Sequence, residues 1–313
     1  MRKGIVVVLL VFSCLTYMSA QRVNSGMVPS GKGYGIPSPN VVEGDPNAVV
    51  QGNGINWHGG SIIPNTVNVY YIWYGNWKGG PKPSDSPTTV QLLQTFARGI
   101  GATPFFNILT TYGDTTDNVT GNVHFAKQTT MLTYPNGKNL TDASILKIVS
   151  NAIGSGALPS DTNGVYFVFT TSDVNETSGF CTSYCGWHTN GTVNGADIKY
   201  SFIGNPDRCP TSCEGQSKGP NSDNGADGIA NIMSHELSEA TTDPDLSAWW
   251  QTATGEEVGD LCAWKWGTLL GGTLGNGGYN ETFGGKNWFL QMEWENSRKG
   301  GCDNFLGGPF HTK

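Results

Sequence analysis

The segment Thr66–Tyr74 reads TVNVYYIWY, an almost unbroken run of β-branched and aromatic residues. These residue types favour a pleated, packed backbone, so the run predicts a strand in the core of a sheet. Val165–Thr170 (VYFVFT) is a second apolar run bounded by turn residues, and it predicts another central strand. Ile198–Ile203 predicts a further strand. The centre of the fold is therefore expected to be a sheet.

Helical patterns alternate with these strands. Residues 86–100 begin with Ser-Pro and continue with helical spacing, and residues 141–153 begin with a Thr-Asp cap and do the same. A third helix is predicted from about Asp227 to Thr242, where a following proline helps to end it. Weaker signals are a short helical segment at Phe105–Leu109 and strand candidates at Asn122–Phe125 and Trp288–Trp294. This order predicts an α+β fold, a mixed sheet with packed helices, compatible with the layout of zinc proteases.

The N-terminal region has the features of an export signal. Arg2 and Lys3 precede an apolar run, Gly4–Leu15, that is too short to span a bilayer, and small residues follow it. We therefore expect residues 1–20 to be a cleaved signal, with an uncleaved anchor as the alternative. Residues 21–50 are rich in Gly, Pro, Asn and Ser and predict a flexible leader. Residues 51–313 are then expected to form a single α+β domain of a secreted protein.

Six cysteines remain once Cys14 leaves with the signal: Cys181, Cys185, Cys209, Cys213, Cys262 and Cys302. An even number in an exported chain predicts three disulfides that stabilise the loops, although two pairs with a four-residue offset also resemble zinc ligands. The pairing is open. Five glycosylation sequons start at Asn118, Asn139, Asn175, Asn190 and Asn280, and we expect them to lie on the surface.

The charge of the chain excludes some partners. The formal net charge is −7, and loss of Arg2 and Lys3 makes it −9. This sign argues against nucleic acid and anionic membrane surfaces as partners. An extracellular peptide or a cell-wall component is the expected partner class, and the oligomeric state is open.

The third predicted helix carries the residues with the clearest chemistry, His235-Glu236-Leu237-Ser238-Glu239. Residues four apart share one face of a helix, so His235 and Glu239 point the same way. An imidazole and a carboxylate one turn apart resemble half of a zinc site, and Glu236 stands where zinc proteases keep a general base. The common form of this motif has a second His in place of Glu239. A third ligand must therefore come from elsewhere.

Asp260 is the first choice for the third ligand, because the Gly259-Asp260 turn lies within reach and a disulfide at Cys262 would hold it. Three other acidic residues compete for this role: Glu257, Asp243 and Asp245. A His, Glu and Asp set suits Zn²⁺, with Ca²⁺ or Mn²⁺ also conceivable. In a catalytic site, Glu236 would activate a metal-bound water.

The apolar arc of this helix includes Glu236, with Glu239 at or near its edge. A buried carboxylate needs a partner, which a bound cation, an Arg, a Lys or a set of backbone donors would supply. His58 and His188 are candidates to line the same cleft, but a structural role is the simpler interpretation for each. The ten tryptophans are interpreted mainly as core, with a carbohydrate-stacking platform as the alternative.

Several short motifs occur in order along the chain: His58-Gly59-Gly60, Val69–Gly75, Gly179-Phe180-Cys181, Cys185-Gly186, Phe202–Pro206, Cys209-Pro210 with Cys213, and Asn224–Gly228. Together they resemble the phosphate-induced protein 1 family, the EXORDIUM-like proteins of plant cell walls. The resemblance implies an extracellular protein of the apoplast or cell wall that is linked to growth, and it implies no established reaction. The His235-Glu236 pair departs from the plant pattern and predicts a metal-bearing branch, with a microbial source as one option.

Two functions follow as hypotheses. The first is a secreted metal-dependent hydrolase, most plausibly a zinc peptidase, with metal ligands His235, Glu239 and Asp260 and with Glu236 as the catalytic base. The second is a non-catalytic extracellular protein, associated with the cell wall or with growth signalling, that keeps the helix for structure alone.

Overall fold

The computed structural model describes residues 29–32, 53–297 and 300–306. The predicted export signal and most of the predicted leader lie outside these ranges. Within the leader, Gly31 O accepts a hydrogen bond from His188 N at 2.9 Å, and Lys32 Nζ pairs with Asp142 Oδ2 at 2.6 Å. Among the described residues, no helix is both long and apolar enough to cross a bilayer.

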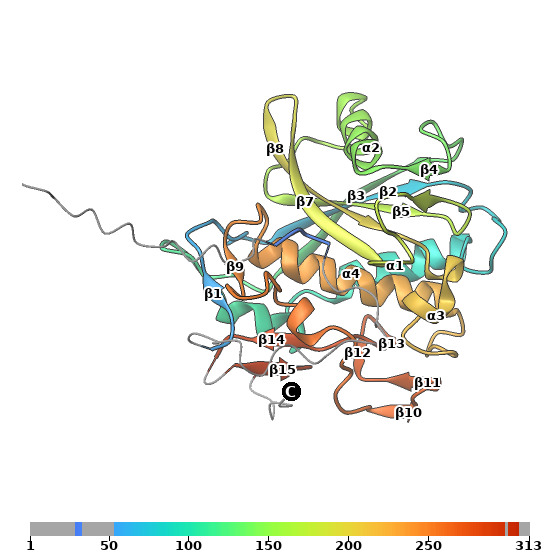
Figure 1. Ribbon diagram of the computed structural model, residues 1–313. Helices are drawn as coiled ribbons and strands as arrows, with labels where there is room; N and C mark the ends of the chain where they lie inside the picture. The colour runs from blue at the N-terminus through green and yellow to red at the C-terminus, as the bar shows by residue number, and fades with distance from the viewer. Residues whose placement is uncertain (1–28, 33–52, 298–299, 307–313) are drawn as a thin grey trace, which may run out of the picture.

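A five-stranded sheet lies at the centre of the molecule, in the order β3-β2-β5-β8-β7 (Figure 1). Its strands are β2 (Val67–Tyr74), β3 (Val123–Met131), β5 (Gly164–Thr170), β7 (Gly186–Val193) and β8 (Ala196–Ile203). Four of them run parallel, and β7 is antiparallel to β8, so the predicted mixed sheet is confirmed. The central strands β2 and β5 are continuous apolar runs because helices cover both faces of the sheet.

Helix α2 (Asp142–Gly154) packs on one face of the sheet, and α1 (Pro87–Gly99) and α4 (Asn224–Thr242) lie on the other (Figure 1). The predicted caps form. Ser86 Oγ accepts a hydrogen bond from Thr89 N, and Thr141 and Ser144 make a capping box. Helix α4 begins three residues earlier than predicted because Asp223 is its cap and accepts from Ala226 N.

The C-terminal third of the chain covers the outer side of α4 with small antiparallel pairs (Figure 1). They are β10 (Gly271–Thr273) with β11 (Asn276–Tyr279), β12 (Glu281–Phe283) with β13 (Lys286–Trp288), and β14 (Glu293–Glu295) with β15 (Gly301–Asp303). As a result, every residue of α4 from Gly225 to Thr242 is buried. A helix enclosed on all sides lies in the core of a protein rather than on its surface.

The remaining elements are short. They are β1 (Asn56–Trp57), which pairs with β9 (Trp249–Trp250), β4 (Asn139–Leu140), which pairs with β6 (Asn175–Glu176), the 3₁₀ helices η1 (Phe106–Thr111), η2 (Pro206–Arg208) and η3 (Asp260–Cys262), and α3 (Pro210–Cys213).

Three disulfides join the six cysteines, as predicted. Cys181 pairs with Cys209, Cys185 with Cys213, and Cys262 with Cys302. The first two attach the loop before β7 to η2 and α3, and the third attaches η3 to β15. The alternative interpretation of the two four-residue spacings as zinc ligands is wrong, because these cysteines are disulfide-bonded.

Two sequence predictions differ from the structure. Residues 288–294 do not form one strand, because side chains accept the backbone N–H groups that a ladder would use. Asn280 Oδ1 accepts from Leu290 N, and Asn231 Oδ1 accepts from Gln291 N. Asn280 is itself buried by this role, so the expectation that all five sequons lie on the surface is wrong for that one.

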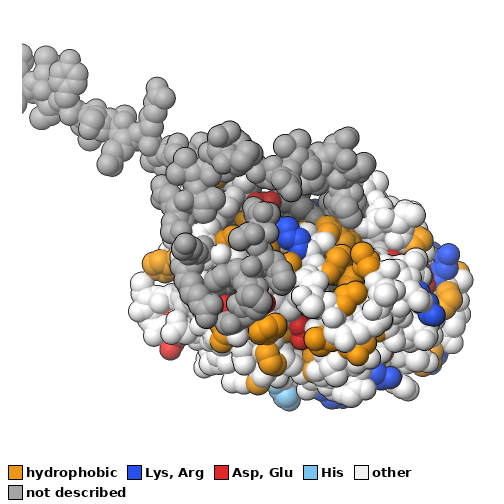
Figure 2. All heavy atoms as spheres, turned by 90° about the horizontal axis from the view of Figure 1, so that it is seen from below, with side chains coloured by type: hydrophobic (Ala, Val, Ile, Leu, Met, Phe, Trp, Pro, Cys, Tyr) orange, Lys and Arg blue, Asp and Glu red, His pale blue; other side chains and the backbone are white. Residues whose placement is uncertain are grey.

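The face formed by the C-terminal hairpins is poor in charge. Figure 2 views the molecule from this side and shows hydrophobic side chains scattered among a few charged ones. The most exposed large apolar side chains belong to β1, the β10–β11 region and the segment after β15: Trp57, Leu270, Leu274, Phe305 and Leu306.

Candidate metal centre

The structure brings the three predicted metal ligands together inside the core. His235 Nε2 lies 3.0 Å from Glu239 Oε1 across one turn of α4, and 3.5 Å from Asp260 Oδ1 at the start of η3. Asp260 N donates to Glu239 Oε1 at 3.1 Å. The three ligand atoms all lie within 4.8 Å of one another. The donor set is therefore assembled, and metal binding itself stays a prediction.

Gln291 contacts the second ring nitrogen of His235. Its Nε2 atom lies 2.8 Å from His235 Nδ1 and donates to Gly259 O at 2.9 Å. The donor in the contact with Nδ1 depends on the tautomer of the ring. A ring that binds an ion through Nε2 carries its proton on Nδ1, and the Gln291 amide would then turn its oxygen toward the ring to accept from it.

A second donor set lies on the other side of Glu239. His188 Nε2, on β7, is 3.2 Å from Glu257 Oε1 and 3.6 Å from Glu239 Oε2. These three side chains also place ligand atoms within 4.8 Å of one another, and all are buried. Glu257 N donates to Asp260 Oδ2 at 3.2 Å, which connects the two sets through the backbone. Glu239 thus directs one carboxylate oxygen toward each histidine.

Glu236, the predicted catalytic base, is buried beside the cluster. Its Oε2 atom has no hydrogen-bond partner among the described residues. Its Oε1 atom lies against Gly186, where a Cβ would come within 3.1 Å of that oxygen and within 2.6 Å of an Ile232 methyl. Gly186 at the start of β7 is therefore what makes room for α4 and Glu236.

Burial dominates the electrostatics of the cluster. It raises the pKa of Glu236 and Glu257 well above the usual range of a glutamate, and together with Asp260 it raises the pKa of Glu239 to about 7. Burial also lowers the pKa of His188 to about 3, with repulsion from His235 adding to the effect. For His235, burial lowers the pKa, but Glu239 and the other nearby carboxylates outweigh it and raise the pKa above its usual range.

Basic side chains do not neutralise these groups. Within the described part of the chain, no Lys or Arg forms an ion pair with Glu236, Glu239 or Glu257. Glu293 is a further buried carboxylate near the cluster. Burying carboxylates costs free energy, and a bound cation is one partner that would compensate for it.

The other predicted candidates have structural partners. Asp243 ends α4 and accepts hydrogen bonds from Ser247 N and Ala248 N at 2.6 Å each. Asp245 Oδ1 lies 3.3 Å from Lys199 Nζ. His58 stacks on Trp250 with 3.6 Å between ring centroids, outside the cluster.

The sequence favoured a structural role for His188, with the lining of the same cleft as the alternative. The strand order places His188 next to α4, where its Nε2 atom faces Glu239 and Glu257. Glu257 was a competitor of Asp260 for the role of third ligand, and the structure places its carboxylate beside His188.

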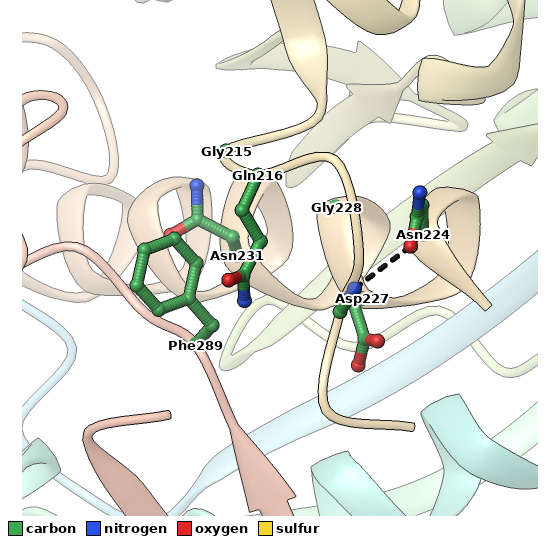
Figure 3. Close-up of a pocket in the computed structure, with 8 residues that line it drawn as sticks. Gly215, Gln216, Asn224, Asp227, Gly228, Asn231 and Phe289 are labelled. Carbon is green, nitrogen blue, oxygen red and sulfur yellow. Dashed lines mark hydrogen bonds between the residues drawn. The ribbon is translucent and has the colours of Figure 1, made fainter. Parts of the chain in front are cut away.

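A small pocket opens near the first turns of α4 (Figure 3). Asn224, Asp227 and Asn231 of the helix line it together with Gln216 and Phe289, and Asn224 accepts a hydrogen bond from Gly219 N at 2.8 Å. None of the histidines or carboxylates of the two donor sets lines this pocket.

Comparisons with known proteins give a consistent result. The family model described as the phosphate-induced protein 1 conserved region matches residues 55–284. Protein EXORDIUM-like 3 of Arabidopsis thaliana is 28% identical over 249 residues, covering 70% of this chain and 71% of that protein. Protein EXORDIUM-like 5 of the same plant is 27% identical over 314 residues, covering 88% and 83%. No solved structure matches the chain.

Proposed function

The chain belongs to the phosphate-induced protein 1 family, and on that premise we propose that it is a non-catalytic extracellular protein of the EXORDIUM type, acting at the cell wall or in growth signalling. In this proposal α4 and η3 together hold a metal ion, α4 through His235 and Glu239 and η3 through Asp260, and the ion stabilises the core. The family match and the three disulfides support an extracellular setting. The branch of the family and the source organism stay predictions.

One observation carries the choice of a non-catalytic role: the burial of the site. Glu239 has no exposed surface, and Glu236 is 3% exposed. Catalytic zinc sites keep one coordination position open to water and substrate, whereas structural sites are closed. The depth of this site therefore supports an ion that holds the fold together.

A metal-dependent hydrolase, most plausibly a zinc peptidase, is the second candidate. Its support is the Oε2 atom of Glu236, which has no hydrogen-bond partner among the described residues. Glu236 lies next to the His235, Glu239 and Asp260 donor set, in the position of a general base that would activate a metal-bound water. The packing of Glu236 against Gly186 and the burial of Glu236 and Glu239 weigh against it. A zincin-like role for α4 belongs to this candidate.

The donor chemistry favours a transition metal. Imidazole with two carboxylates suits Zn²⁺ and, less selectively, Mn²⁺. Ca²⁺ takes oxygen ligands and gains nothing from the histidine. We therefore propose Zn²⁺ as the resident ion.

The two candidates are separated by metal analysis combined with an assay of peptide hydrolysis. Purified protein should contain zinc and show no cleavage of fluorescent casein or of a mixed peptide library above that of the Glu236→Gln variant. Glu281→Gln, another buried glutamate outside the cluster, is the matched control. Turnover that Glu236→Gln abolishes and Glu281→Gln retains would replace the first candidate by the hydrolase.

A further inference from the structure

We propose that His188, Glu239 and Glu257 form a second metal position, so that Glu239 bridges two divalent ions in the core. The ion at His235, Glu239 and Asp260 is part of the proposed function, and only the bridge depends on it. The second position shares Glu239 with that site, and its other two ligands, His188 and Glu257, come from outside α4.

The spacing of the donors fits a shared ion. Two ligand atoms that are each about 2.1 Å from one ion, at angles between 90° and 110°, lie roughly 3.0–3.4 Å apart. His188 Nε2 lies 3.2 and 3.4 Å from the two oxygens of Glu257 and 3.6 Å from Glu239 Oε2. Small side-chain movements would bring all of these atoms to bonding distance.

Hydrogen bonding alone leaves this group unsatisfied. A neutral imidazole carries one N–H, yet His188 Nε2 faces three carboxylate oxygens. Glu239 Oε2, on a side chain with no exposed surface, has no hydrogen-bond partner among the described residues. An ion at this point would bind Glu239 Oε2 and His188 Nε2 directly, so that one N–H would no longer be shared among three carboxylate oxygens.

Two divalent ions also balance the negative charge of the buried carboxylates better than one ion does. Glu236, Glu239 and Glu257 are buried without a Lys or Arg partner in the part of the chain that the structure describes, and Asp260 and Glu293 lie nearby. One divalent ion balances the charge of two carboxylates, whereas two ions balance that of four of these five. Pairs of ions bridged in this way lie about 3.5–4 Å apart in known two-metal sites.

The second position is rigid enough to bind an ion. His188 lies in the β7–β8 ladder opposite Ser201, and its backbone N–H donates to Gly31 O at 2.9 Å. Glu257 is fixed by its N–H bond to Asp260 Oδ2. Ligands on strands, and on turns that are held by hydrogen bonds, keep the geometry that metal binding requires.

The test is the zinc content of purified full-length variants, measured after gel filtration in buffer free of chelators. Wild type should carry two zinc ions per chain. His188→Gln and Glu257→Gln should each carry one, and so should His235→Gln. His124→Gln, which changes an exposed histidine in the same way, should keep two.

Retention of the wild-type zinc content by both His188→Gln and Glu257→Gln would overturn the second position. If wild type carries a single ion that only His235→Gln loses, the second position is refuted and the ion of the proposed function stands. For variants that fold poorly, wild-type protein reconstituted with Mn²⁺ gives an independent test by electron paramagnetic resonance. A bridged pair gives the spectrum of two exchange-coupled ions, and a signal of isolated Mn²⁺ alone would refute the bridge.

Discussion

At the scale of single residues, the site depends on a glycine as well as on its histidines and carboxylates. Gly186 lies at the point where β7 meets α4, and any side chain there would press on Ile232 and Glu236. His235 and Glu239 follow from helical spacing, so the sequence predicted them. His188 and Glu257 come from a strand and a turn outside α4, and although the sequence offered both as candidates, no local pattern indicates that they face each other.

Gly186→Ala should destabilise the protein by about 1–3 kcal/mol, because a Cβ there overpacks a closed core. Urea unfolding measures the change in the free energy of unfolding. Gly154→Ala, at the end of α2 where a Cβ meets nothing within 4 Å, is the matched control and should be neutral or stabilising by about 0.5–1 kcal/mol. Equal effects of the two substitutions would contradict the packing argument.

Glu281 should make stability depend on pH. Burial and the nearby Asp303 raise the pKa of Glu281 to about 8, from an ordinary value of 4.5. The folded state then holds a proton that the unfolded state releases, so Glu281 costs stability as pH rises from about 4.5 to about 8. Relative to wild type, Glu281→Gln should be unchanged at pH 4 and increasingly more stable toward pH 8.5. Chemical unfolding across this range tests the trend, and a difference independent of pH would refute it.

At the scale of elements, the sequence predicted what local patterns determine. The strand Val67–Tyr74 and the helices α1 and α2 have clear runs and caps, and they form close to the expected bounds. The early start of α4 was missed because Asn224-Gly225 has the composition of a turn, while Asp223 supplies the cap. The C-terminal hairpins have short, glycine-rich strands whose pairing depends on packing against α4, and no periodic pattern indicates them.

The disulfide Cys262–Cys302 should matter for the ion because it ties η3, which begins at Asp260, to β15. Replacing both cysteines by alanine should lower zinc affinity about 10-fold or more, since a ligand that is less well positioned must be ordered on binding. Competition with a fluorescent chelator measures this affinity. Replacing Cys181 and Cys209, whose disulfide joins no helix or strand that carries a donor residue, should change the affinity much less.

At the scale of the whole molecule, the family and the disulfides are compatible with an extracellular protein. The comparisons show which family the chain belongs to and identify no reaction, and the ion that stabilises the core is our proposal. The α+β architecture could be predicted from the alternation of elements. The burial of the whole motif helix could not, because it results from the C-terminal hairpins closing over α4.

Glycosylation reports on the folded surface. Asn118 and Asn139 are exposed, whereas Asn280 is buried and donates to Trp266 O and Leu290 O at 2.6 Å each. In a secreted eukaryotic preparation, mass spectrometry of glycopeptides should therefore find glycans at Asn118 or Asn139 and none at Asn280. A glycan at Asn280 on stably folded protein would contradict the packing of this region.

The most direct test of the central claim, that the histidines and carboxylates around α4 hold metal, is thermal unfolding with and without a chelator. An ion that binds only the folded state at a concentration 100 times its dissociation constant adds about 2.7 kcal/mol to the free energy of unfolding. EDTA should therefore lower the Tm of wild type and of His124→Gln by several degrees, and leave the Tm of Glu239→Gln unchanged. A wild-type Tm that EDTA and added Zn²⁺ both leave unchanged would contradict the account.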